Sequence, residues 1–407
     1  MSSEVPADGQ GAGVSERPRA PRGERAATGD QAGAGARADA TSELAGAVSG
    51  GRATLLGPDV VVCVGPGGVG KTTTAAALAL RGAYDGRRAC VVTIDPARRL
   101  ADALGARHVG NEPHRVGPPA GARAWPGELW AVMLDAQSTF DHLVGRYATS
   151  ETQAHAILSN PVYRNISAAL SGTQEYMAVE KLYELQESGR WDLIVVDTPP
   201  ARHALDFMEA PRHVIRLLDN RVFRLLMAPT RAGLRAIELG GQLLLRTVAK
   251  VAGGQVVADT VEFFAEFEGM EDGFRARAKR ADELLHSERT EFALVCSPRR
   301  DTVDEALFLA GQLAGEGLEV DKVIVNRCYP RYQLVSPGVA DSLAGSPLAP
   351  FVTNLEQLAL VASKEEEQLD RVAGALPKAS LYRVPFLARE VADLEALAEV
   401  ARYLDEG

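Results

Sequence analysis

The chain has 407 residues, which corresponds to two or three domain-sized units at about 150 residues per domain. Its 46% hydrophobic and 24% charged residues are typical of globular proteins and exclude collagenous and wholly disordered classes. A formal net charge of −10 argues against a nucleic-acid or anionic-membrane surface, and no segment is apolar enough to predict a membrane span. We therefore expect a cytoplasmic protein without a nucleic-acid partner.

Residues 1–57 form a low-complexity stretch that is rich in Gly, Ala, Arg, Ser and Pro and contains no aromatic residue. This composition offers too little apolar surface to offset the entropy of ordering the backbone, so it predicts a disordered tail. The stretch also lacks the continuous apolar core of a signal peptide. We expect the folded part of the chain to begin after it.

A strand and a phosphate-binding motif follow the tail. Residues 60–64 are a β-branched apolar run, which is typical of a strand buried on both faces. The run leads into 65–72, which matches G-x-x-x-x-G-K-[ST], and then into a helix expected at 73–84. In this motif backbone N–H groups surround the phosphates, Lys71 reaches the β- and γ-phosphates, and Thr72 offers a hydroxyl to Mg²⁺. The sequence therefore predicts a nucleoside-triphosphate site.

Two carboxylates follow apolar strands further along the chain. Asp95 comes after a strand expected at 89–94, and Asp197 follows one at 193–196. The carboxyl ends of parallel strands form the ligand-binding edge of an open α/β sheet, so both side chains are expected near the phosphate loop. Taken singly, an Asp after a strand is also a common turn or capping residue. Together with Lys71, the pair favours a role in catalysis.

The region from Leu205 to about residue 286 has the periodicity of helices. Apolar residues recur there at spacings of three and four in two stripes: Val214, Leu217, Leu218, Val222, Leu225 and Leu226, then Ile237, Leu244, Val248 and Val251. One interpretation is a groove for a hydrophobic client segment. The other is that the stripes pack these helices on one another and on the sheet.

The rest of the chain supplies further elements of the same sheet. The pattern predicts strands at 292–296, 320–325 and 380–385 and helices at 302–314 and 389–403. Stretches rich in Pro and Gly predict long surface loops at 110–127 and 330–350.

The four cysteines form no CxxC pair and have no His partners at metal-ligand spacing. Cys63, Cys90 and Cys296 fall within apolar strands, where cysteine behaves as a small hydrophobic residue. We expect buried thiols, with neither a disulfide framework nor a zinc site.

These motifs resemble those of the ArsA-like ATPases, a family that includes the arsenical-pump and guided-entry-of-tails targeting ATPases within the deviant-Walker P-loop class. The resemblance rests on the glycine-rich loop 65–73, the Asp-Pro-Ala turn at 95–97 and the Asp-Thr-x-Pro-x-x-His segment at 197–203. It implies a doubly wound, mostly parallel α/β sheet at 58–204 and 290–407, with an inserted helical subdomain at 205–289. It also implies ATP held at a dimer interface, with hydrolysis opening and closing the pair.

The resemblance further assigns roles to individual residues. The phosphate cradle would be Gly67, Gly68, Val69, Gly70, Lys71, Thr72 and Thr73. Asp95 would orient the attacking water, Thr72 would bind Mg²⁺, and Asp197 would support the metal through its water shell. Asn326 falls where the family reads the adenine edge, and an amide can both donate to and accept from adenine, although Asn is also common at turns. Pro385 lies in a segment that would pack on the base.

One position departs from the family pattern. The second residue of the loop is Pro66, where the family has a lysine that reaches the partner's phosphates. A cation facing the γ-phosphate can accelerate phosphoryl transfer about 10³- to 10⁵-fold, so its loss matters. We hypothesise that Arg202 replaces it as a catalytic residue, or that a partner subunit supplies a lysine; the alternative is that Arg202 is solvated or structural.

Three functions are compatible with these features. The favoured one is an ATPase that acts as a nucleotide-gated switch on a protein client, as a homodimer or a heterodimer with a related ATPase. The second is a weakly active, nucleotide-binding regulatory subunit of a heteromer with a paralogous ATPase that carries the missing lysine. A metalloid- or anion-pump ATPase is less favoured because no cysteine triad is evident. A DNA-partitioning or membrane-surface ATPase would require a basic patch, whereas the charged residues of 389–407 are mostly acidic.

Overall fold

The computed structural model describes residues 57–95, 99–106, 109–119, 124–161, 163, 173–220, 259, 262–263, 265–332 and 336–404. The strands are β1 (Val60–Val64), β2 (Arg88–Thr93), β3 (His114–Val116), β4 (Glu128–Met133), β5 (Leu193–Asp197), β6 (Thr290–Cys296), β7 (Val320–Cys328) and β8 (Ser380–Pro385). The helices are α2 (Lys71–Tyr84), α3 (Arg99–Ala103), α4 (Ala136–Tyr147), α5 (Glu151–Ser159), α7 (Thr173–Glu187), α8 (Ala201–Asp219), α13 (Glu271–Leu285), α14 (Arg300–Gly315), α15 (Pro337–Leu343), α16 (Ala349–Ala375) and α17 (Leu394–Tyr403).

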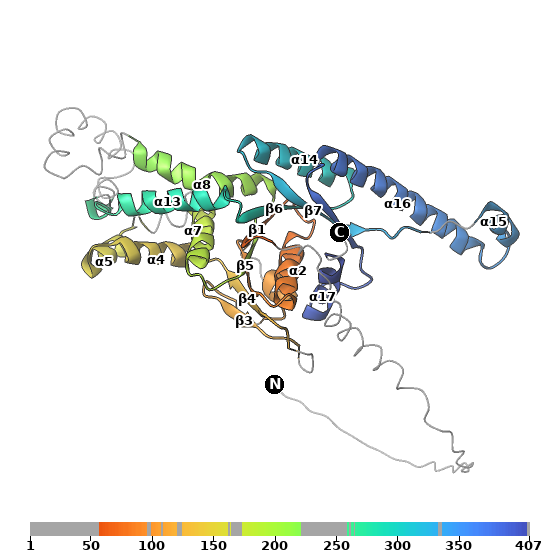
Figure 1. Cartoon of the computed structure of the whole chain (residues 1–407), viewed down its shortest axis with the longest axis horizontal. Helices are drawn as coiled ribbons and strands as arrows, with labels where there is room; N and C mark the ends of the chain where they lie inside the picture. The colour runs from red at the N-terminus through yellow and green to blue at the C-terminus, as the bar shows by residue number, and fades with distance from the viewer. Residues whose placement is uncertain are drawn as a thin grey trace, which may run out of the picture. The chain divides into compact units, whose positions relative to one another are not determined.

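The strands form one eight-stranded sheet in the order β3-β4-β2-β5-β1-β6-β7-β8 (Figure 1). Every described pairing is parallel except that of β3 with β4, so the expected doubly wound, mostly parallel sheet is confirmed. Strand β1 lies between β5 and β6. The phosphate loop therefore leaves the sheet near its centre, beside the end of β5 that carries Asp197.

Alternating side chains of each strand enter two cores on opposite faces of the sheet. Along β1, Val60, Val62 and Val64 belong to one core, while Val61 and Cys63 belong to the other. The first core is covered by α7, α8, α13, α14 and α16, and the second by α2, α3 and α17. Burial on both faces explains why these strands read as continuous apolar runs rather than as alternating patterns.

A third cluster joins helices beyond the sheet. Its aromatic centre includes Phe274 of α13, whose ring lies against Phe140, Tyr147 and Phe267. Helices α4, α5, α7, α8 and α13 all contribute buried side chains to it (Figure 1). The helical layer therefore draws on chain that precedes β5 as well as on the helices that follow it.

The apolar stripes expected after Leu205 are only partly described. Val214 and Leu218 of α8 pack into the third cluster, whereas Leu217 is 54% exposed. The remaining members of the first stripe and all of the second lie outside the described residues. For Val214 and Leu218, packing within the chain's own helices is the observed outcome.

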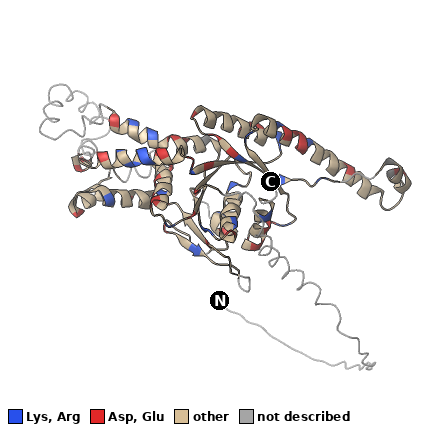
Figure 2. Cartoon of the chain, in the orientation of Figure 1, with Lys and Arg blue, Asp and Glu red and all other residues tan. Residues whose placement is uncertain are grey.

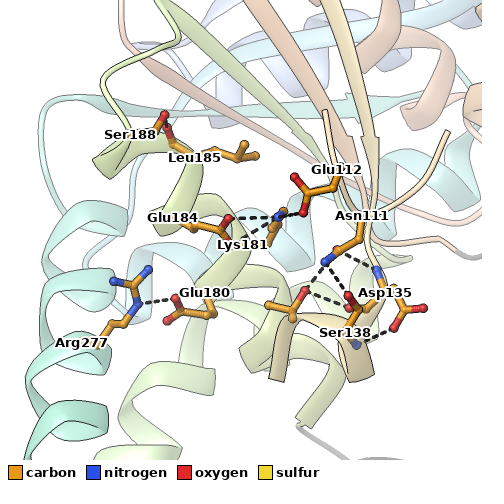
Figure 3. Close-up of polar contacts among 11 residues, drawn as sticks. Asn111, Glu112, Asp135, Ser138, Glu180, Lys181, Glu184, Leu185, Ser188 and Arg277 are labelled. Carbon is orange, nitrogen blue, oxygen red and sulfur yellow. Dashed lines mark hydrogen bonds and ion pairs between the residues drawn. The ribbon is translucent and has the colours of Figure 1, made fainter. Parts of the chain in front are cut away.

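Polar contacts also hold the helical layer together (Figure 3). Arg277 of α13 and Glu180 of α7 are both buried and form an ion pair, which joins the two helices. The side chain of Lys181 is fully buried and lies 3.2 Å from a carboxylate oxygen of Glu184 and 4.0 Å from one of Glu112. Arg277, Glu180 and Lys181 are thus buried but paired, as buried charges generally are.

The prediction of two long surface loops is wrong in part. The stretch 110–127 contains the short edge strand β3, which pairs with β4, and 330–350 contains α15 and the start of α16. Pro337 and Pro350 occupy the first turns of these helices, where the missing N–H has no helical partner to lose. The prolines that suggested a loop therefore mark helix starts.

Other boundaries shift by a few residues. Strand β7 continues through Asn326 to Cys328 rather than ending at 325. Helix α17 begins at Leu394, not at 389, because the side chain of Asp393 accepts a hydrogen bond from the N–H of Ala396 and caps the helix.

The half of α16 nearest α15 contributes nothing to the core. Between 337 and 361 no side chain that the structure describes is buried, and Phe351 and Leu360 are 70% and 59% exposed. Figure 2 shows few charged residues along this half, in contrast with the acidic half that returns to β8.

None of the helices in the described ranges is long and apolar enough to cross a membrane.

Candidate functional site

The phosphate loop joins β1 to α2 in a conformation that requires glycine. Gly70 has φ +96° and caps α2, and a Cβ there would collide with the amide nitrogen of Asn326. Gly65 has φ +149°, and a Cβ there would collide with the carbonyl of Val295 on β6. The motif glycines thus permit both the left-handed backbone and the close packing of the loop on β6 and β7.

Lys71 begins α2 and points back over the loop. Its Nζ donates to the carbonyl oxygens of Gly65 at 3.0 Å and Pro66 at 2.8 Å. The side chain is buried, and burial lowers the pKa of its ammonium, while the negative charge of Asp197 opposes this shift. The loop therefore holds a cation among its own carbonyl groups.

Asp197, at the end of β5, is the carboxylate nearest the loop. Its Oδ2 accepts hydrogen bonds from the hydroxyls of Thr72 at 2.7 Å and Thr93 at 2.9 Å. Burial raises the pKa of the Asp197 carboxyl to about 6, and the two hydroxyls and the charge of Lys71 limit this rise. Three segments distant in sequence thus meet at one carboxylate.

The atoms at this point fit a magnesium ion. Oδ1 of Asp197 is buried and has no hydrogen-bond partner among the described residues, so one carboxylate oxygen is left for a further ligand. Carboxylate and hydroxyl oxygens are the ligand type that Mg²⁺ prefers, and Mg²⁺ keeps several waters of its own. The glycine-rich loop fits a polyphosphate, because a Cβ added at Gly68 would meet no atom within 4 Å and the loop backbone is open there.

Asp95 lies at the end of β2, near the same edge. Its carboxylate is 3.7 Å from Arg99 in a half-exposed ion pair, and its charge helps raise the pKa of Asp197. Arg202 lies in the first turn of α8, and its side chain is outside the described residues. The structure thus brings Lys71, Thr72, Asp95 and Asp197 to one edge, and the hypothesis about Arg202 stays a prediction.

The segments assigned to the base lie on the other side of the loop. Asn326 is buried in β7, and its Nδ2 donates to the carbonyl of Val69 at 2.8 Å. Pro385 ends β8 opposite Cys328, and the next residue, Phe386, is 57% exposed and stacks on Tyr329 with ring centroids 6.0 Å apart. The structure therefore places Asn326 against the phosphate loop and Pro385 on the adjoining strand.

Sequence reasoning missed two residues of this site. The hydroxyl of Thr93 donates a hydrogen bond to Asp197. The sequence could have indicated this residue, because Thr93 is a hydroxyl residue at the end of a strand near the loop. Arg327 donates from Nη1 to the carbonyl of Gly68 at 3.2 Å. Its backbone conformation, which directs it there, leaves no signal in a single sequence.

The cysteines are far from reactive. Cys63, Cys90 and Cys296 are fully buried in β1, β2 and β6, which confirms the expected core positions, and Cys328 is buried at the end of β7. Burial raises the pKa of Cys90, Cys296 and Cys328 to about 12, so these thiols stay protonated at neutral pH. Thiolates are what bind soft metals, so these residues are poor metalloid ligands.

A family profile and several known proteins match most of this chain. The profile of the anion-transporting ATPases matches residues 59–337. An uncharacterised protein of Streptomyces coelicolor is 29% identical over 73% of this chain and 68% of its own length. A putative arsenical pump-driving ATPase 1 of Aquifex aeolicus is 23% identical (85% and 78% covered), and an ATPase GET3 of Podospora anserina is 22% identical (84% and 88% covered).

Proposed function

We propose that this chain, which belongs to the anion-transporting ATPase family, binds ATP with Mg²⁺ at the carboxyl edge of its sheet, hydrolyses it and works as a nucleotide-gated dimeric switch on a protein client or partner. The observation that carries the proposal is the contact between Thr72 and Asp197, 2.7 Å long, beside an unpartnered carboxylate oxygen. It joins the phosphate loop to a strand end at the carboxyl edge of the sheet, where a metal and a γ-phosphate can be held together.

Each residue of the site has a task in this proposal. The N–H groups from Gly67 to Thr73 bind the phosphates, and Lys71 exchanges its loop carbonyls for phosphate oxygens. Thr72 and Asp197 would hold the metal, and Asp95 would orient the attacking water. Bound Mg²⁺ would neutralise the charge that develops on the phosphates.

The same site supports a second candidate, a regulatory subunit that binds nucleotide and turns it over slowly. The observation that favours it is Pro66, which is buried and uncharged at the loop position where the resembled family has a lysine that reaches the partner's phosphates. A related chain with a lysine there would complete the active site in a heterodimer. If Arg202 supplies the charge instead, a homodimer is sufficient.

The client is the least constrained part of the proposal. The helical segment 205–289 is the proposed client-binding subdomain, and Leu217 is its exposed large apolar residue among those described. One relative is named an arsenical pump-driving ATPase, but the protonated, buried cysteines of this chain argue against arsenite as its cargo. A protein or peptide client fits better.

The proposal is tested by steady-state ATP hydrolysis with Mg²⁺, together with the mass in solution with and without nucleotide. We expect Lys71→Ala to lower kcat by about 100-fold or more, because it removes a cation from the developing charge. Lys378→Ala is the control, since Lys378 is exposed and pairs with Glu319 on the surface.

The outcomes separate the candidates. Turnover that depends on Lys71, with a nucleotide-dependent homodimer, supports an ATPase complete in itself. Tight ATP binding without turnover or self-association supports the regulatory subunit. Absence of ATP binding by the wild-type chain would refute both.

A further inference from the structure

The end of β7 carries an unusual backbone conformation. Arg327 has φ +65°, and it is the one non-glycine residue with positive φ in the described part of the chain. At the same point the register between β7 and β8 shifts, between Asn326 and Cys328. A left-handed conformation is unfavourable for a residue with a Cβ, and such strain persists where surrounding contacts hold it.

The contacts that accompany this conformation are both to the phosphate loop. Nδ2 of Asn326 donates to the carbonyl of Val69 at 2.8 Å, and Nη1 of Arg327 donates to the carbonyl of Gly68 at 3.2 Å. Successive residues of a regular strand point to opposite faces of the sheet. The left-handed turn at Arg327 breaks this alternation, so two neighbouring side chains reach two neighbouring loop carbonyls.

Holding a carbonyl also fixes the N–H group of the same peptide. The peptide is planar and trans, so its C=O and N–H point in opposite directions. With the Gly68 and Val69 carbonyls held toward β7, the N–H groups of Val69 and Gly70 point away from β7. In a phosphate loop, successive N–H groups that point inward are what bind the anion.

We propose that Asn326 and Arg327 form a clamp that positions the phosphate loop, by holding the carbonyl groups of Gly68 and Val69 so that the N–H groups of Val69 and Gly70 face the phosphates. Arg327 is a positioning residue in this scheme, because it acts through the loop. The inference rests on the proposed function, since it takes a nucleotide phosphate as the ligand of the loop.

The clamp makes a different prediction for Asn326 from the role that the family resemblance implies. A residue that reads the adenine edge discriminates between ATP and GTP. A residue that holds the loop affects both nucleotides equally, because it acts on the phosphates that they share. Substitution of Asn326 by Ala is therefore expected to lower the affinities for ADP and GDP by the same factor.

The test uses the full-length chain and two readouts. Arg327→Gly removes the guanidinium and keeps a residue that adopts φ +65° without strain, so it isolates the hydrogen bond. We expect its affinity for Mg-ADP, measured by calorimetry, to fall about 5- to 10-fold, with partial recovery in Arg327→Lys. Hydrogen exchange of the peptide that contains Val69 and Gly70, measured without nucleotide, is expected to accelerate in Arg327→Gly.

Arg331→Ala is the control, because Arg331 is an exposed arginine of the same segment that pairs with Glu366 instead of the loop. Its affinity for Mg-ADP and the hydrogen exchange of its loop peptide are expected to match those of wild type. Unchanged ADP affinity and loop exchange in Arg327→Gly would overturn the clamp. If wild type binds no nucleotide, the proposed function fails, and the exchange measurement alone decides the clamp: faster exchange supports it and unchanged exchange overturns it.

Discussion

The sheet edge around Asp197 and the helical layer around Glu180 each bury a carboxylate, and each leaves one of its oxygens without a hydrogen-bond partner among the described residues. Burial raises the pKa of both, to about 6 for Asp197 and about 7 for Glu180. By burial, pKa and unpaired oxygen alone, the two are alike.

Their neighbours differ. Asp197 receives the hydroxyls of Thr72 and Thr93, which leave its charge available to a cation. Glu180 is paired with Arg277, whose guanidinium already balances the charge of the carboxylate (Figure 3). The two buried carboxylates are therefore distinguished by their partners, which are neutral hydroxyls at Asp197 and a charged guanidinium at Glu180. Asp197 belongs to the proposed chemistry, whereas Glu180 joins two helices.

The largest effect is expected from breaking the pair in the helical layer. Arg277→Met leaves Glu180 buried without its cation, so we expect the free energy of unfolding to fall by about 3–5 kcal/mol. Urea unfolding measures this. Arg275→Met, on the same helix but in exposed ion pairs with Asp219 and Asp272, should cost less than about 1 kcal/mol.

If Arg277→Met had the same free energy of unfolding as wild type, the ion pair would not stabilise the helical layer. If the folded variant also lost affinity for ATP, the helical layer and the sheet edge would not be independent. We expect folded Arg277→Met to bind ATP as wild type does.

At the sheet edge the expected effects are reversed. Asp197→Asn keeps the size of the side chain but removes the charge that supports the metal, so we expect ATP hydrolysis to fall about 100- to 1000-fold. The free energy of unfolding should change by about 1 kcal/mol or less, because the buried charge is itself unfavourable.

Asp192→Asn is the matched control for this variant. Asp192 precedes the same strand at the opposite edge of the sheet and pairs on the surface with Arg88. Hydrolysis that survives in Asp197→Asn would exclude this carboxylate from the chemistry.

The smallest effect concerns pH. Burial raises the pKa of Glu180 from 4.5 to about 7, so between these values the folded chain holds a proton that the unfolded chain has released. The free energy of unfolding therefore decreases as pH rises through this window, by at most about 1.4 kcal/mol per pH unit from this group. Glu180→Gln cannot titrate, and its unfolding should depend less on pH.

Asp197 adds a slope of the same sign that fades above its pKa of about 6, and this slope is present in both wild type and Glu180→Gln. The difference between the two proteins in urea unfolding between pH 6 and 7 therefore reports on Glu180. Identical slopes for wild type and Glu180→Gln in that window would contradict the raised pKa of Glu180.

The sequence predicted the centre of the sheet and its loop because these features are local. A β-branched run, a glycine motif and an alanine-rich helix at 60–84 each impose their own conformation, and strands buried on both faces read as apolar runs wherever they occur. Asp95 and Asp197 could be placed at one edge because all parallel strands end there.

Tertiary structure decided what local pattern does not encode. The contacts of Thr93 with Asp197 and of Arg327 with Gly68 join residues 104 and 259 positions apart, and the left-handed backbone of Arg327 coincides with the second of these contacts. Likewise, which buried carboxylate meets an arginine and which meets two hydroxyls depends on the helix or strand that lies beside it in the fold. Local preference sets the elements, and long-range contacts set the partners that give each side chain its chemistry.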